Sequence, residues 1–233
     1  MNIKADSRRC KQGDIFVFFL GVDGDGHRFI ADAVKNGATK VVAEEEGDYG
    51  VDTLIVKDSR AYLNAYLESH YGNIIDEMNI IGVTGTNGKT TTAYLIYEAL
   101  NLLNIKCAYI GTIGFYLDKK IKNLNNTTPG NIELFELINK AYDMGYQYVI
   151  MEVSSHSLKQ KRCSFIDFSY AIFTNLSEDH LDYHKNMLDY VESKQILFKE
   201  LCHGINIVNN DDLYSDYFKI NNYVTYGFNK SDY

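Results

Sequence analysis

The stretch that decides the fold is Ile80–Thr92, which has the sequence IIGVTGTNGKTTT. Its apolar start, Ile80–Val83, predicts a buried strand, and the apolar spacing over residues 89–104 predicts a helix. The segment Gly85–Thr91 joins the two. Its glycines let backbone N–H groups turn toward an anion, and the positive end of the helix dipole adds to the attraction. The stretch therefore predicts a loop that binds the phosphates of ATP.

Two side chains of this loop have specific tasks in such a site. Lys89 can reach the β- and γ-phosphates, and the Thr90 hydroxyl can ligate magnesium. The strict pattern G-x-x-x-x-G-K-[ST] is not met, because Val83 occupies the position of its first glycine. The alternative interpretation is a glycine-rich turn with an exposed lysine. The flanking strand and helix favour the nucleotide site, whose candidate residues are Gly85, Thr86, Asn87, Gly88, Lys89, Thr90 and Thr91.

Downstream of the loop, short apolar runs alternate with helical patterns. Such alternation predicts right-handed βαβ units and a parallel sheet covered on both faces. The fold class is therefore α/β. The predicted strands are 107–110, 148–151, 170–173, 205–208 and 223–226, and the predicted helices are 131–144 and 187–202.

Upstream of the loop, residues 1–77 predict a small mixed α/β domain. We expect strands at 15–20, 40–43 and 53–56 and helices at 28–37 and 58–70. The break at Tyr71–Asn73 places the domain boundary at about residue 77 and assigns residues 78–233 to a second domain. The acidic stretch Asp23–Gly26 predicts a tight turn, because the spacing of an EF-hand is missing.

The composition excludes several classes of function. The formal net charge of −8 argues against general nucleic-acid binding, which needs a basic face. No apolar run is long enough to span a membrane, and the first residues lack the apolar core of a secretory signal. Four scattered cysteines without a C-x-x-C pair are typical of reduced thiols. We expect a cytoplasmic protein with neither a membrane nor a nucleic-acid partner.

Several candidate residues follow predicted strands, where open parallel sheets bind their ligands. Glu152 ends one strand, and a carboxylate facing the phosphate loop is a natural ligand for magnesium; the alternative is a solvated charge. The segment Phe173–His184 holds two histidines among three acids, which suggests a metal site, although a lone histidine is more often structural. Asn126–Pro129 on its own predicts a helix start with a threonine cap. Lys194 on its own predicts a lysine on a helix surface.

Together these segments resemble Mur ligases of the MurE type. The resemblance rests on GVTGTNGKTTT (82–92), NTTP (126–129), MEVSSHSL (151–158) and FTNLSEDHLDYH (173–184), and in the first domain on DSR (6–8), GDIFV (13–17) and DGHRFI (25–30). It implies a uridine-binding domain followed by a central ATPase domain that is incomplete here, with the C-terminal domain absent. The central segments resemble MurE more than MurF.

The resemblance also implies roles for individual residues. The catalytic residues would be Lys89, His180 and Lys194, the last carbamylated. Two magnesium ions would be held by Thr90, Glu152, His180 and Lys194. The acidic substrate would be bound by Ser7, Asn126, Thr127, Thr128, Ser154, Gln160 and Arg162. The roles of His156 and His184 stay open between functional and structural.

The reaction that the resemblance implies joins an amino acid, meso-diaminopimelate or lysine, to UDP-MurNAc-L-Ala-D-Glu through an acyl phosphate made with ATP. We expect a monomer that binds the muramoyl substrate but does not turn over alone. Two alternatives stay open: an inactive or split-ligase binding module, and another amide ligase of the superfamily, such as a folylpolyglutamate or cyanophycin-type enzyme.

Overall fold

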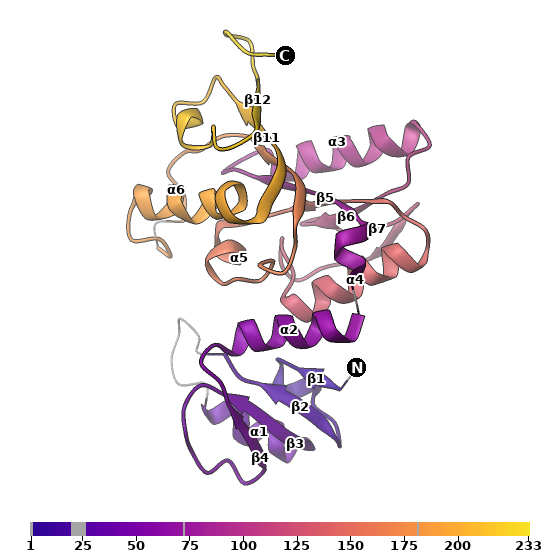
Figure 1. The fold of residues 1–233 in the computed structure, drawn as a ribbon, viewed down its shortest axis with the longest axis vertical. Helices are drawn as coiled ribbons and strands as arrows, with labels where there is room; N and C mark the ends of the chain where they lie inside the picture. Colours follow the sequence, from indigo (N-terminus) through magenta and orange to yellow (C-terminus); the bar gives the residue numbers. More distant parts are fainter. Residues whose placement is uncertain (1, 20–26, 72, 181) are drawn as a thin grey trace. The chain divides into compact units, whose positions relative to one another are not determined.

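The computed structural model describes residues 2–19, 27–71, 73–180 and 182–233 (Figure 1). These residues form two compact units, Met1–His70 and Tyr71–Tyr233. The predicted turn at Asp23–Gly26 and the predicted strand end at Leu20 lie outside the described residues.

The first unit contains a four-stranded parallel sheet with the order β1-β2-β3-β4. Its core gathers apolar side chains of the strands with those of helix α1, among them Phe16, Val41, Ile30 and Ala33. The elements are β1 (Ile3–Lys4), η1 (Ser7–Arg9), β2 (Asp14–Val17), α1 (His27–Lys35), β3 (Ala38–Ala43), β4 (Asp52–Ile55) and α2 (Ser59–Tyr71). The three predicted strands and two predicted helices are present, whereas the two-residue β1 was not predicted.

The second unit is built on an eight-stranded sheet with the order β12-β11-β10-β5-β9-β6-β7-β8. The strands from β12 to β6 are parallel, so the predicted α/β class with a mainly parallel sheet is confirmed. The parallel strands are β5 (Asn79–Thr84), β6 (Cys107–Gly111), β9 (Tyr148–Glu152), β10 (Phe168–Phe173), β11 (Cys202–Asn209) and β12 (Tyr223–Tyr226). The helices are α3 (Lys89–Leu102), α4 (Asn131–Asp143), α5 (Ser155–Lys159) and α6 (Met187–Ile196), with the short 3-10 segments η2 (Asn73–Glu77) and η4 (Ser215–Tyr217).

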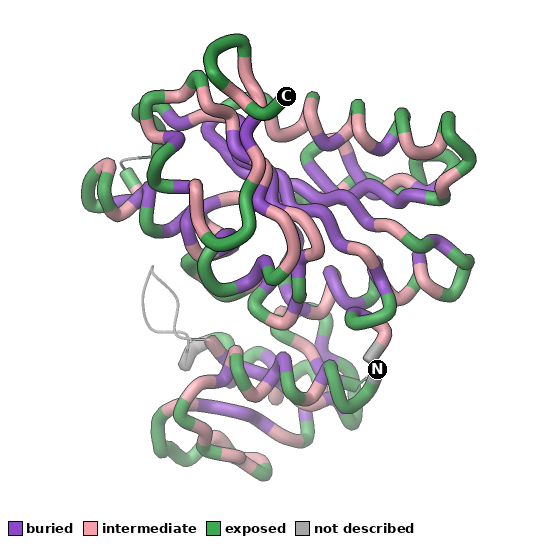
Figure 2. Tube along the Cα trace, turned by 45° about the horizontal axis from the view of Figure 1, so that its top comes forward, coloured by how far each residue is buried: buried purple, intermediate pink, exposed green. Residues whose placement is uncertain are grey.

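Helices cover both faces of this sheet, as its apolar strands require. Helix α3 lies on one side, where Ala93 and Tyr97 pack on Val83 and Ile150, and α4, α5 and α6 lie on the other (Figure 1). The central strands are buried along almost their whole length, and the exposed positions gather on the helices and loops (Figure 2). Strand β5 lies between β9 and β10, and all three are parallel. Their carboxyl ends therefore lie side by side at one end of the sheet.

In this unit one predicted helix was placed wrongly, and two elements were not predicted. At the edge of the sheet lies an antiparallel hairpin, β7 (Gly114–Tyr116) and β8 (Lys120–Lys122). These strands are too short to show an alternation of apolar and polar residues in the sequence. The predicted helix 187–202 divides into α6 and a π-helical turn η3 (Leu197–Leu201), and β11 then begins at Cys202. The short helix α5, capped by Ser154, was not predicted.

The predicted threonine cap before α4 was also wrong. The cap residue is Gly130, which makes no side-chain hydrogen bond to the helix. Thr128 instead donates its hydroxyl to the backbone carbonyl of Glu152 at 2.9 Å. The cap was misassigned because a strand distant in sequence competes for the hydroxyl.

Candidate functional site

The glycine-rich loop lies between β5 and α3, as the sequence predicts. Gly85 has a φ of 152° and Gly88 a φ of 82°, and Gly88 is the cap residue of α3. A Cβ at Gly85 would lie 1.9 Å from Oγ1 of Thr174, so glycine is needed here for space as well as for conformation. The Thr174 hydroxyl donates to the Asn87 carbonyl at 2.7 Å. The end of β10 therefore holds the loop in shape.

Asn175 continues this support. Its side-chain carbonyl accepts from Asn87 N at 3.0 Å, and its backbone carbonyl accepts from Thr86 N at 2.8 Å. The Thr86 hydroxyl donates to the Ser177 carbonyl at 3.2 Å. Sequence reasoning did not single out Thr174 or Asn175; their place at a strand end in FTNLSEDH was the available signal.

Two lysine ammonium groups meet at the carbonyl oxygen of Gly85. Nζ of Lys89 donates to it at 2.9 Å, and Nζ of Lys194 donates to it at 2.8 Å. Lys194 is only 1% exposed, so the interpretation as a helix-surface lysine is wrong. Burial lowers the pKa of Lys194 well below its usual range, and the neighbouring Lys89 charge lowers it further. Burial also lowers the pKa of Lys89. The loop thus brings two lysine nitrogens to one carbonyl oxygen, an arrangement that an anion bound nearby would stabilise.

Glu152 ends β9 with a fully buried side chain, so the interpretation as a solvated strand-end charge is wrong. Oε2 accepts from the Thr90 hydroxyl at 2.8 Å and from the Thr112 hydroxyl at 3.1 Å. Oε1 accepts from the Thr112 backbone N–H at 2.8 Å and from the Tyr109 hydroxyl at 2.5 Å. Buried carboxylates are stable only with such partners. The Thr90 hydroxyl and the Glu152 carboxylate lie together as hard oxygen donors, which suits magnesium.

A cavity of about 250 Å³ lies at this end of the sheet, and Glu152 is not among the residues that line it. Most of the predicted substrate residues of the second unit meet there with the two lysines. The lining residues are Lys89, Asn126, Thr127, Thr128, Ser154, Ser155, His156, Arg162, His180, Tyr190 and Lys194. Thr91 lies exposed on the first turn of α3, outside this lining.

Arg162 is held by its neighbours at the rim of the cavity. Nε and Nη2 donate to the Gln160 side-chain carbonyl at 2.9 and 2.6 Å, and Nη1 donates to the Thr128 backbone carbonyl at 3.1 Å. Gln160 in turn donates to the Tyr183 hydroxyl at 3.2 Å. Burial lowers the pKa of Arg162 without removing its charge at physiological pH. The guanidinium is therefore positioned in advance for an anionic ligand, with neutral partners only.

The three histidines differ in environment. His184 is buried, its Nε2 lies 2.9 Å from the Ser155 hydroxyl, and this favours the structural role. His180 is exposed, has a φ of 54°, and its ring lies 5.0 Å from that of His156. Burial and the nearby His180 lower the pKa of His156 to about 4. In the part of the chain that the structure describes, no three histidine, cysteine, aspartate or glutamate side chains form a metal cluster.

Ser7 belongs to the first unit, whereas the residues that line the cavity belong to the second. It begins η1, is buried, and its backbone carbonyl accepts from Nδ2 of Asn36 at 3.0 Å. Asp6 caps this short helix by accepting from the Arg8 N–H. Ser7 therefore lies buried at the start of a capped 3-10 turn.

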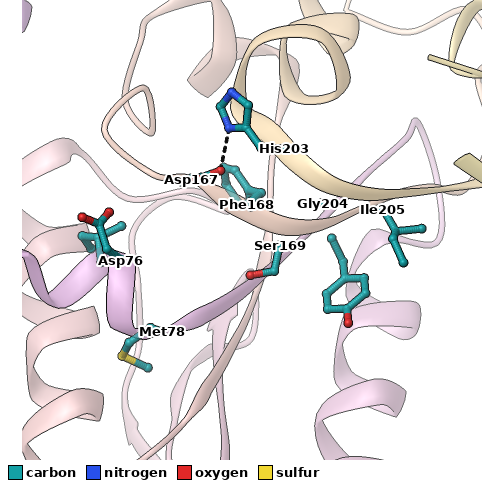
Figure 3. A pocket seen from close by; sticks show the side chains of 10 residues that line it. Asp76, Met78, Asp167, Phe168, Ser169, His203, Gly204 and Ile205 are labelled. Carbon is teal, nitrogen blue, oxygen red and sulfur yellow. Dashed lines mark hydrogen bonds and ion pairs between the residues drawn. The ribbon is translucent and has the colours of Figure 1, made fainter. Parts of the chain in front are cut away.

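A larger cavity of about 360 Å³ lies at the opposite end of the strands, where β5, β10 and β11 begin (Figure 3). Its titratable side chains include Asp76, Asp167 and His203, and Nδ1 of His203 lies 2.7 Å from Oδ1 of Asp167. Both partners of this pair are more than half exposed. Lys89 of the phosphate loop and the buried Lys194 line the cavity at the carboxyl ends of the strands and not this larger one. The site at the carboxyl ends is therefore the functional candidate.

Within the described ranges, no helix is both long enough and apolar enough to cross a membrane.

Comparisons with known proteins agree across the chain. The family model described as Mur ligase middle domain matches residues 83–233, and the one described as Mur ligase family, catalytic domain, matches residues 1–76. Two curated relatives, from Clostridium perfringens and Fusobacterium nucleatum, are named UDP-N-acetylmuramoyl-L-alanyl-D-glutamate--2,6-diaminopimelate ligase. They are 43% and 40% identical over 91% and 99% of this chain, and over 44% and 49% of their own length. The chain thus spans about half the length of these relatives.

Solved structures show the same fold. A structure with the same ligase name superposes with a TM-score of 0.82 at 30% identity, over 100% of this chain and 50% of its own. A MurF structure from Acinetobacter baumannii superposes with a TM-score of 0.65 at 23% identity, over 97% and 48% of the two chains.

Proposed function

Because this chain belongs to the Mur ligase family, we propose that it binds ATP and UDP-MurNAc-L-Ala-D-Glu as part of a ligase that adds diaminopimelate to the D-Glu residue. Diaminopimelate, rather than lysine, is the amino acid named for the curated relatives. The observation that carries the proposal is the meeting of Lys89 and Lys194 at the Gly85 carbonyl, because an anionic ligand favours lysine nitrogens held this close together.

In this proposal, each part of the cavity has one task. Lys89 and the loop amides hold the β- and γ-phosphates, while Arg162 and the Asn126–Thr128 segment present the D-Glu carboxylate. That carboxylate attacks the γ-phosphate, displaces ADP and becomes an acyl phosphate. The incoming amine then displaces phosphate and loses one proton, which leaves the amide. Catalysis would come mainly from positioning and charge neutralisation. Thr90, Glu152 and His180 would hold magnesium, which when bound would neutralise charge on the transferring phosphoryl group.

Residues 1–77 are the proposed uridine-binding domain, with Ser7 as a nucleotide contact, and residues 78–233 the central ATP-binding domain. The proposed location is the cytoplasm and the proposed state a monomer. Ligation by residues 1–233 alone is not expected, because the relatives are about twice as long.

Lys194 is proposed to carry a carbamate. Its depressed pKa makes the neutral amine available, and that amine adds to carbon dioxide with loss of one proton. The product is an anionic oxygen ligand for magnesium beside Lys89. We expect carbon-13 NMR with labelled bicarbonate to show one protected carbamate resonance, which Lys194→Met abolishes and Lys199→Met retains. A spectrum of Lys194→Met that keeps the signal would refute the assignment.

The test of the substrate class is calorimetric titration of UDP-MurNAc-L-Ala-D-Glu into the chain. Arg162→Ala should weaken binding by about 10- to 100-fold, because it removes a charge-assisted pair with a carboxylate or phosphate. Lys161→Ala is the matched control, since Lys161 is the exposed neighbour of Arg162 and does not line the cavity. Equal affinities for unmodified chain and Arg162→Ala would contradict the role of Arg162, and absence of saturable binding to folded chain would contradict the substrate class.

A further inference from the structure

The carboxylate of Glu152 lies in a cradle made by neighbouring strand β6 and the residue after it. The sheet order puts β6 next to β9, with Tyr109 opposite Ile150 and Ile110 opposite Met151. Tyr109 and Thr112 supply three of the four hydrogen bonds to the carboxylate, and Thr90 of the phosphate loop supplies the fourth. Most hydrogen bonds to the Glu152 carboxylate thus come from Tyr109 and Thr112, to which the proposed reaction gives no role.

The two carboxylate oxygens are held differently. Oε1 accepts from the Tyr109 hydroxyl at 2.5 Å and from the Thr112 N–H at 2.8 Å. Both donors belong to β6 or to the residue that follows it, and neither belongs to the phosphate loop. Oε2 accepts from the Thr90 hydroxyl at 2.8 Å and thus faces the phosphate loop. Fixing Oε1 orients the whole carboxylate, because its two oxygens are rigidly joined. Oε2 is thereby aimed at the place where a phosphate-bound cation would lie.

Gly111 leaves the space that this arrangement requires. A Cβ at this position would lie 2.2 Å from Oε1 of Glu152 and 2.3 Å from the Tyr109 hydroxyl oxygen. Both distances are far below van der Waals contact, so any larger residue would displace the carboxylate or the phenol. The close approach of Tyr109 to Glu152 therefore depends on glycine between Tyr109 and Thr112.

The phenol of Tyr109 is itself rigid and protonated. Its side chain is fully buried, and its ring contacts those of Tyr94, Tyr97 and Tyr116 at centroid distances of 5.7, 6.2 and 5.7 Å. Burial raises the pKa of Tyr109, and the hydrogen bond to Glu152 raises it further. The hydroxyl therefore stays a donor at physiological pH. An aromatic cluster that fixes the ring also fixes the direction of this hydrogen bond.

From this geometry we propose that Tyr109 is a positioning residue, which orients Glu152 toward the divalent cation that accompanies the nucleotide. The proposal rests on the proposed function, since it assumes that ATP and magnesium bind at the loop. Partners that orient a metal ligand generally change metal affinity by about 10- to 100-fold when they are removed. Tyr109 acts through Glu152 and does not contact the nucleotide or the cation itself.

The experiment is calorimetric titration of the non-hydrolysable ATP analogue AMP-PNP, with magnesium and with EDTA, into the chain and its variants. Tyr109→Phe removes only the hydroxyl and should reduce the affinity gain from magnesium by about 10-fold, while affinity in EDTA stays unchanged. Tyr116→Phe is the matched control, since its ring belongs to the same cluster, and it should retain the full gain. A merely structural role would lower both affinities together.

Thr112→Val is a second variant, which removes the hydroxyl bond to Oε2 but keeps the backbone bond to Oε1, and it should also reduce the magnesium gain. Thermal denaturation identifies variants that remain folded. A full magnesium gain in folded Tyr109→Phe would overturn the positioning role. Failure of the unmodified chain to bind AMP-PNP would overturn the proposed function itself, and the two failures are therefore distinguishable.

Discussion

Gly85→Ala should lower nucleotide affinity by about 100-fold or more and the free energy of unfolding by about 3 kcal/mol. The added Cβ would lie 1.9 Å from Oγ1 of Thr174, and the residue has a φ of 152°, which L side chains rarely adopt. Moving Thr174 away would break its hydrogen bond to the Asn87 carbonyl, and moving the loop would displace the carbonyl that Lys89 and Lys194 share. Neither relaxation leaves the phosphate loop intact.

Calorimetry with AMP-PNP and urea denaturation measure these two effects. Gly130→Ala is the matched control, because a Cβ there meets nothing within 4 Å and φ is −73°. It should leave nucleotide affinity unchanged and cost at most about 1 kcal/mol, the usual difference between glycine and alanine at a helix cap. Near-normal affinity of Gly85→Ala would mean that the loop does not bind phosphate in the shape described.

Lys194→Met should increase the free energy of unfolding at neutral pH by about 1–4 kcal/mol in bicarbonate-free buffer. The substitution removes a buried amine, whose charged form is disfavoured by burial, but keeps most of the apolar volume of the side chain. The Gly85 carbonyl remains hydrogen-bonded, because Lys89 still donates to it. The variant should also lose the proposed carbamate, so stability and function should change in opposite directions.

The pH dependence of this difference has a definite sign. The pKa of Lys194 is lowered in the folded chain, so between that pKa and the usual value of about 10.4 the unfolded chain binds more protons. Stability of the unmodified chain then rises with pH over this window, and the advantage of Lys194→Met shrinks. Lys199→Met, at an exposed position, should stay within about 0.5 kcal/mol of the unmodified chain. A pH-independent difference, or a less stable Lys194→Met, would contradict this account of the buried charge.

Several features of the site could be predicted because neighbouring residues encode them. The strand, loop and helix of Ile80–Thr92 follow from apolar spacing and from glycines at the positions that need positive φ. Glu152 and the segment that begins at Thr174 could be placed at strand ends, and the carboxyl ends of parallel strands share one edge of a sheet. The convergence of these segments on one cavity follows from that topology.

The burial and the hydrogen-bond partners of individual side chains could not be predicted from neighbouring residues. Lys194 lies 109 residues from Gly85 in the chain, and nothing in the local helical pattern distinguishes it from a surface lysine. Tyr109 lies 43 residues from Glu152, and nothing in the local strand pattern marks it as the partner of that carboxylate. Thr128 matches the pattern of a helix cap, yet a distant strand carbonyl takes its hydroxyl.

The sequence by itself determined most of the strands and helices, the phosphate loop and the family, because these depend on residues a few positions apart. Only the tertiary structure decided which charges are buried and which groups support them. The physical reason is that burial and hydrogen-bond partnership depend on which strands are neighbours. The order β10-β5-β9-β6 brings Thr174, Gly85, Glu152 and Tyr109 together from four separate segments.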